Sequence, residues 1–292
     1  MIGHHGPIVP GELWASWNLD WFTWGALAGA ALVYGWAAVV RPPSDSWRPR
    51  CFFAGLGVAA VALVSPLDAL SGSLGSAHMV QHVLLTMVAA PLLVLGAPVQ
   101  AVLRALPPSA RRRSGAWRRH PLARAAARAA GDPVLTAGVF VAVLWIWHAR
   151  GPYEAALGND VLHAVEHATF FAAAALSWAA LLSARRRRLR SGVGVLVLFG
   201  LSMQCGLLGV LLTFATEPWY PTYETTTQVW GLSPLTDQQL SGVIMWVPAG
   251  GIYLVVALVL LRRLISSPPP VPDRSPTGRK PATSVDRLGA RP

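Results

Sequence analysis

Residues 77–103, AHMVQHVLLTMVAAPLLVLGAPVQAVL, contain no Asp, Glu, Lys or Arg. An α-helix needs about 20 predominantly apolar residues to cross the hydrocarbon core of a bilayer. This stretch therefore predicts a membrane-spanning helix, and its length allows the helix to cross with a tilt. Its two histidines, at positions 78 and 82, stand close to one end of the span.

The rest of the chain has the same character. Of its 292 residues 53% are hydrophobic and 13% are charged, whereas a soluble domain carries about a quarter charged residues. We therefore expect an all-α fold, a polytopic membrane bundle of seven transmembrane helices. Three regions are predicted: an extracytoplasmic segment (1–18), the helix bundle (19–265) and a disordered cytoplasmic tail (266–292). The predicted spans are 19–40, 51–70, 77–103, 133–149, 160–184, 192–215 and 238–265.

The basic residues indicate how the bundle is oriented. Of the 24 Lys and Arg residues, 23 fall in segments 41–50, 104–132, 185–191 and 262–292, which alternate with segments that hold only Arg150. The positive-inside rule then predicts an extracytoplasmic N-terminus and a cytoplasmic C-terminus. The net charge of +11 is accordingly interpreted as a topology signal and as a contact with anionic membrane lipids. Nucleic-acid binding is not expected, because no aromatic residues or known motif accompany the basic runs.

Five histidines are predicted to lie at one depth, near the outer face. His78 and His82 follow each other in the third span, His163 and His167 in the fifth, and His148 ends the fourth. Both pairs have i, i+4 spacing, which places two imidazoles on one helix face with Cβ atoms about 5–6 Å apart. Two imidazoles at this spacing can coordinate one metal ion, and imidazole is a ligand of both copper and zinc. The spacing therefore predicts a metal or haem site.

Further polar and soft side chains are expected at a comparable depth. Glu166 stands between His163 and His167, where it could orient an imidazole or accept a proton. The other accessory candidates of the predicted site are Gln81, Asp237, Met245 and Trp246. The two cysteines, Cys51 and Cys205, form no CxxC pair and predict no disulfide framework.

Several functions remain open from the residues alone. The run His163-Ala-Val-Glu-His167 matches the H-x-x-E-H pattern of inverse zincin proteases. Two histidines on facing helices could instead bind haem. A cation transporter would need polar residues that continue to the inner side, and the sixth span offers only Ser202, Gln204 and Cys205 there. The histidines could also be interhelical contacts that bind nothing.

Several motifs, in order, resemble those of the CtaG-type cytochrome c oxidase assembly factors. They are HMVQH (78–82), APLLVLGAP (90–98), WIWH (145–148), LHAVEH (162–167), PWY (218–220) and DQQLSGVIMW (237–246). The resemblance covers about residues 20–265 and implies a seven-helix protein of the bacterial cell (inner) membrane. It implies a non-catalytic factor needed to make active haem–copper oxidase, with His78, His82, His148, His163 and His167 as the motif histidines.

Together the residues and the resemblance favour a factor of the respiratory chain that carries copper in its reduced form. Zinc or haem is a less favoured ligand of the same histidines. The expected partners are a cytochrome c oxidase subunit, an extracytoplasmic copper chaperone and the membrane lipids. The alternatives are a haem-binding membrane protein and a metal-free chaperone of the oxidase.

Overall fold

The computed structural model describes residues 8–183 and 188–266, and all regular structure in these ranges is helical. The predicted all-α fold is therefore confirmed for the described residues. The tail predicted to be disordered falls, beyond residue 266, outside them. The α-helices are α1 (Trp21–Val40), α2 (Trp47–Val64), α3 (Pro66–Ser71), α4 (Gly75–Val83), α5 (Ala90–Leu95), α6 (Pro98–Ala105), α7 (Pro108–Arg119), α8 (Pro121–Ala130), α9 (Pro133–His148), α10 (Arg150–Leu157), α11 (Asp160–Ser183), α12 (Arg188–Thr213) and α13 (Pro234–Ser266).

Six helical segments among the described residues are long and apolar enough to cross a membrane. They are α1, α2, the continuous stretch from α4 through α6, α11, α12 and α13. A seventh span is possible if α8 and α9, which meet at a bend of 73°, are counted as one broken span. The prediction of a multi-pass membrane protein is thus confirmed, with six or seven spans by length and composition.

The second span differs in its bounds from the predicted 51–70. Helix α2 begins earlier, at Trp47, and ends at Val64, before Ser65 adopts an extended conformation with ψ 170°. Pro66 then opens α3 at its first position. Proline lacks a backbone N–H and disfavours helical geometry in the residue before it, so the helix stops there. The predicted basic segment 104–132 likewise contains two helices, α7 and α8.

The third span is continuous but irregular. A π-helical turn over Leu84–Ala89 lies between α4 and α5, and π turns frequently occur at functional sites. Ala97, with φ 53°, separates α5 from α6 and precedes Pro98. The π turn directly follows the segment that carries His78 and His82.

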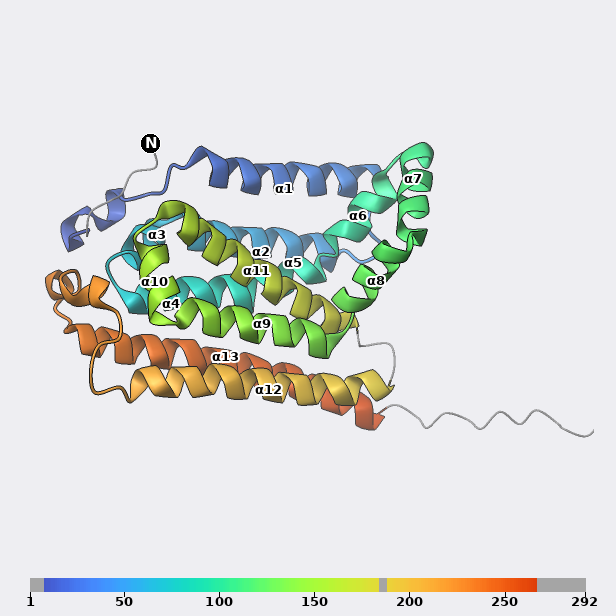
Figure 1. Cartoon of the computed structure of the whole chain (residues 1–292). Coiled ribbons are helices and arrows are strands. Elements are labelled where there is room, and N and C mark those ends of the chain that lie inside the picture. The colour runs from blue at the N-terminus through green and yellow to red at the C-terminus, as the bar shows by residue number, and fades with distance from the viewer. Residues whose placement is uncertain (1–7, 184–187, 267–292) are drawn as a thin grey trace, which may run out of the picture.

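The long helices run side by side, with short helices gathered at the two ends of the bundle (Figure 1). Helices α12 and α13 form one side and α1 forms the opposite side, while α9 and α11 lie between them (Figure 1). The short helices α3 and α10 lie at one end, and α7 and α8 at the other. Helices α9 and α11, which carry three of the five candidate histidines, thus lie between these two sides (Figure 1).

Helices α12 and α13 approach closely at two glycines. A Cβ added to Gly209 would come within 3.0 Å of the Trp246 side chain, and one added to Gly242 would meet the backbone of Gly209 and Thr213. Small residues let transmembrane helices approach closely enough for backbone-level packing. Close packing at these glycines thus holds α12 and α13 together. Trp246, an accessory candidate of the predicted site, packs in this interface.

Candidate metal centre

The start of α4 is fixed by an acidic side chain from α13. The carboxylate of Asp237 accepts hydrogen bonds from the backbone N–H groups of Gly75 and Ser76, at 2.7 and 3.1 Å, and from the Ser76 hydroxyl at 2.5 Å. These donors would otherwise be orphaned at the helix N-terminus. Asp237 therefore positions the helix whose next turn carries His78.

Gln81 fixes the opposite face of α4. Its amide donates to the Ala62 carbonyl and to Asp68 Oδ1, both at 2.8 Å. Asn18, which precedes α1, donates to Asp68 Oδ2, also at 2.8 Å. Gln81, predicted as an accessory group, thus holds α4 against the break between α2 and α3, while the histidines on either side of it project elsewhere.

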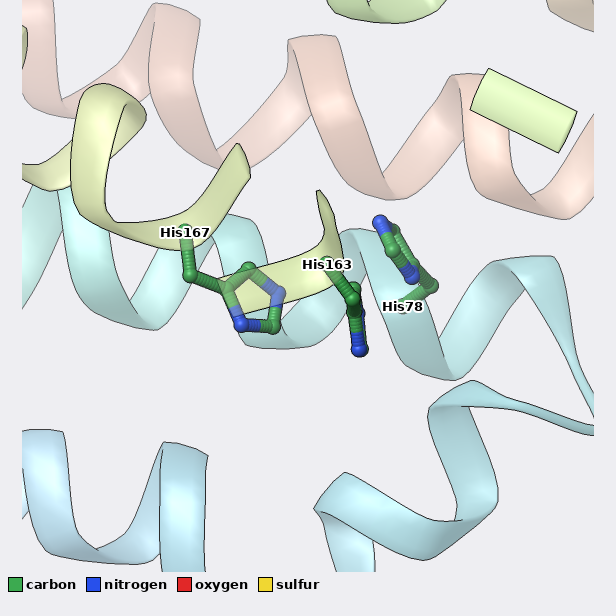
Figure 2. Close-up of side chains that lie close together, drawn as sticks. All are labelled: His78, His163 and His167. Carbon is green, nitrogen blue, oxygen red and sulfur yellow. The ribbon is translucent and has the colours of Figure 1, made fainter. Parts of the chain in front are cut away.

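The structure brings the rings of all five candidate histidines together. The ring centroids of His78 and His82 are 4.4 Å apart, and those of His163 and His167 are 4.3 Å apart. Across the two helices, His78 lies 5.4 Å from His163, and His82 lies 5.1 Å from His167. Figure 2 shows His163 and His167 on one helix beside His78 on the next. His148, at the end of α9, completes the cluster 6.4 Å from His82.

Glu166 points into the cluster. One carboxylate oxygen, Oε1, lies 3.5 Å from Nε2 of His78 and 3.4 Å from Nε2 of His82. The side chain is 1% exposed. The carboxylate is therefore within reach of the same centre as the imidazoles of α4, and its negative charge favours a cation there.

Several polar atoms of the cluster are buried and have no hydrogen-bond partner among the described residues. They are Nδ1 of His78 and His82, Nε2 of His148, His163 and His167, and Oε2 of Glu166. An unsatisfied polar group inside a bilayer costs several kcal/mol. So many unpaired polar atoms at one place are explained if they face a ligand.

His148 shows which nitrogen is available. Its Nδ1 lies 2.8 Å from the Leu144 carbonyl oxygen, which can only accept, so Nδ1 carries the proton. In a neutral imidazole the buried Nε2 then keeps its lone pair. A histidine held in this way by a backbone carbonyl has the arrangement that metal-ligating histidines usually show.

Among the described residues, two groups of three ligand atoms lie close enough together to hold a metal ion. One consists of His78, His163 and His167, the other of His78, His82 and Glu166, and within each group the atoms lie within 4.8 Å of one another. His78 belongs to both groups, and His148 belongs to neither. Neither of these groups contains a sulfur ligand. The buried cluster can thus hold a metal ion with nitrogen and carboxylate ligands.

Three buried tyrosines cover the cluster at one end of the bundle. Tyr153 lies 5.3 Å from the His78 ring, and its hydroxyl is 3.2 Å from that of Tyr223. Tyr223 also donates to the Ser71 carbonyl, and Tyr220 donates to the His148 carbonyl. Burial raises the pKa of all three tyrosines, so they remain neutral hydroxyls at physiological pH. The sequence analysis did not predict this layer of tyrosines. One of them, Tyr220, lies in the Pro-Trp-Tyr motif.

The soft side chains lie outside these two ligand groups. Met245, predicted as an accessory candidate of the site, is buried in the main apolar core, and Met203 is exposed. Gln204 accepts a hydrogen bond from the indole of Trp145 at 3.0 Å. The described residues therefore offer the centre imidazoles and one carboxylate.

These features define a class: a multi-pass helical membrane protein whose interior holds a cluster of histidines around a carboxylate. Within that class the family is settled, because the cytochrome c oxidase caa3 assembly factor family (Caa3_CtaG) matches residues 30–267. The chain belongs to this family, and the predicted family resemblance is confirmed. The members are assembly factors, which are generally not catalytic. No curated protein and no solved structure gave a match.

Proposed function

We propose that the protein binds copper in its reduced form at the histidine cluster and aids the delivery of copper to haem–copper cytochrome c oxidase. The family supports a part in assembling the oxidase. The observation that carries the copper proposal is the convergence of five imidazoles whose buried nitrogens lack partners. The proposed ligands are His78, His82, His148, His163 and His167, with two to four of them used at a time.

The proposed orientation follows from the positive-inside rule. The arginines of α7 and α8 lie at the end of the bundle opposite α3 and α10 (Figure 1). With the basic end in the cytoplasm, the cluster faces the outer half of a bacterial cell membrane. An extracytoplasmic copper chaperone would reach the cluster from that side. Residues 19–265 would form the membrane domain.

Zinc and haem remain weaker candidates for specific reasons. Imidazole binds zinc as well as copper, and the choice of copper rests on the oxidase that the family serves. Haem with two axial histidines needs the two imidazoles on opposite faces of the porphyrin plane, with room for the macrocycle between them. The ring centroids of His78, His163 and His167 instead lie 4.3–5.8 Å apart. Catalysis by the H-x-x-E-H pattern is not supported, because Glu166 faces His78 and His82 and is buried from water.

A metal-free chaperone is the second candidate. The Nε2 atoms of His78 and His82 lie 2.5 Å apart, and both face Glu166. A shared proton and the carboxylate could hold this part of the cluster together without a metal. In that case the histidines would join α4 to α11, and the protein would assist the oxidase by contact alone.

Metal content separates the two candidates. Detergent-purified protein would be loaded with reduced copper without oxygen, desalted and analysed by mass spectrometry, with zinc loading and the Soret region measured in parallel. The variants are a quadruple His78→Ala, His82→Ala, His163→Ala, His167→Ala protein and the control His120→Ala, which alters an exposed histidine at the junction of α7 and α8. We expect about one copper per chain in the wild type and the control, and less than about a tenth of that in the quadruple variant. A wild type that retains no copper would contradict the proposal and favour the metal-free chaperone.

A further inference from the structure

A long groove separates α1 from α11. It has a volume of about 2410 Å³ and is also lined by α2 and by the segment from α5 to α6. Its charged lining residues stand at its ends, with Asp20, Asp68 and Asp160 near the starts of α1, α3 and α11 and with Asp45 and Arg48 near the start of α2. Between the ends most lining residues are apolar, and the polar ones include Thr23, Tyr34, Gln100 and two histidines. The groove therefore lies within the depth of the membrane.

Contacts near its two ends attach α1 to the bundle. At one end Asn18 donates to Asp68 at 2.8 Å. At the other, Tyr34 donates to the Gly96 carbonyl at 2.9 Å and stacks on Phe52 with 3.8 Å between ring centroids. Between these contacts α1 lines the groove with small residues and with larger apolar ones such as Leu27 and Val33. Figure 1 shows this helix standing apart from the rest of the bundle.

The two histidines that reach the groove belong to the metal centre. His163 and His167 line it, and both have an Nε2 atom without a hydrogen-bond partner among the described residues. His167 is only 8% exposed, while His78 and Glu166 are 0% and 1% exposed. Tyrosines cover the cluster on another side. His163, the least buried ring of the cluster, therefore marks the side from which a ligand can approach.

The volume of the groove matches that of a helix. A cylinder about 10 Å across and about 30 Å long, the size of a slender transmembrane helix, occupies about 2400 Å³. Small residues line both walls: Ala26, Gly29 and Ala30 on α1, and Ala164, Ala168 and Ala175 on α11. Small residues at such positions let a neighbouring backbone approach closely, which favours a helix over a lipid chain.

We propose that this groove receives an apolar transmembrane helix of the oxidase subunit that accepts the copper. This inference rests on the proposed function, since it assumes that His163 and His167 hold the cargo. The incoming helix carries a neutral imidazole or a thioether at the level of these two histidines. Copper then leaves through the membrane-facing side of the protein, into the client helix.

The transfer step is a ligand exchange. A bond from copper to the client's imidazole nitrogen or thioether sulfur forms while the bond to Nε2 of His163 or His167 breaks, and each remaining bond to a histidine of the cluster breaks as a further neutral ligand of the client or a water binds in its place. Copper keeps its reduced state, so no electron acceptor is required. Both ligands are neutral, so no proton is released.

Photocrosslinking in the host membrane tests the proposal. A photoreactive phenylalanine would replace Ala168, which is exposed and lines the groove. The matched control places it at Leu207, which is 49% exposed on α12 and is outside the groove lining. Counted from the predicted outer helix ends, the two positions lie at similar depths. Copper content of the purified protein would be measured in parallel.

We expect the probe at position 168 to crosslink to a transmembrane peptide of an oxidase subunit, identified by mass spectrometry, with a yield at least about tenfold above position 207. Ala168→Phe should fill the groove, keep the copper content of the purified protein and lower the copper content of the membrane oxidase. Leu207→Phe should change neither quantity.

Each failure is distinguishable. Normal copper binding together with lipid-only crosslinks at both positions would contradict the proposal that the groove receives a client helix. The copper proposal would be unaffected. An oxidase crosslink from a protein that binds no copper would overturn the copper site and the cargo route, and leave a docking surface for a chaperone. An oxidase crosslink of equal yield from both positions would also contradict the proposal, because it would show no preference for the groove.

Discussion

The helix pairs α4–α11 and α12–α13 differ in the side chains that fill their interfaces. At the two close-approach sites of α12–α13, Gly209 meets Trp246 and Gly242 meets the backbone of the facing helix. The α4–α11 pair instead buries four imidazoles and the carboxylate of Glu166, and each of these five groups has an atom without a hydrogen-bond partner in the part of the chain that the structure describes.

The difference indicates what the histidines do. The α12–α13 pair shows that this chain can join helices with small and apolar residues. Interhelical hydrogen bonds contribute only about 0.6 kcal/mol each on average in a membrane protein. Unpaired polar atoms inside a bilayer are costly. The cluster in α4–α11 therefore lowers stability, and a metal ion bound there would offset that cost.

The largest effect is expected from the double variant His78→Ala, His82→Ala. Copper affinity should fall at least about 100-fold, which is about 2.7 kcal/mol, because His78 belongs to both candidate ligand groups. The thermal unfolding temperature of the metal-free protein should also fall, because the buried Glu166 carboxylate loses the two imidazoles that face its Oε1 atom. Competition with a copper chelator and thermal unfolding in detergent measure the two quantities. Unchanged copper affinity with a lowered unfolding temperature would assign the histidines to helix packing.

A smaller effect on stability is expected in the other pair. In Gly242→Ala the new Cβ would meet the Gly209 carbonyl oxygen at 2.5 Å and the Thr213 backbone nitrogen at 2.7 Å. Overpacking of this kind destabilises by about 2 kcal/mol, so the unfolding temperature should fall while the copper bound per folded chain stays constant. The control Gly251→Ala, on the same helix with nothing within 4 Å, should be neutral or slightly stabilising. Equal unfolding temperatures for both variants would show that α12 and α13 do not pack closely there.

The smallest effect is expected at a polar group that already has a partner. Gln204→Leu removes the hydrogen bond from the Trp145 indole and should lower stability by about 0.6 kcal/mol. Copper affinity should be unchanged, since Gln204 lies outside both candidate ligand groups. Thermal unfolding and chelator competition measure both quantities, and a tenfold loss of copper affinity would extend the metal centre to α12.

Much of the fold was predictable from the sequence, because long apolar runs in a membrane have few alternatives to helices. The local departures were harder to predict. Pro66 was visible, but it was not evident that α2 would stop at Val64 and a new helix would begin. The π-helical turn after His82 has no sequence signal of its own, since it depends on packing against neighbouring helices.

The meeting of the histidines was predictable from the i, i+4 pairs and the alternating topology. The direction in which the Glu166 side chain points was not predictable. Its position beside His163 and His167 in the sequence does not indicate that it faces His78 and His82 on the other helix. The contact of Asp237 with the start of α4 joins residues 161 and 162 positions apart in the sequence, which local patterns cannot show. Such roles depend on how helices pack, which hydropathy does not specify.

X-ray absorption at the copper edge of the loaded wild-type protein tests the central claim most directly. The account predicts reduced copper with about two to four nitrogen or oxygen neighbours, the outer-shell scattering of imidazole and no sulfur shell. A sulfur shell, or a first shell without imidazole scattering, would place the copper away from the histidine cluster and contradict the account.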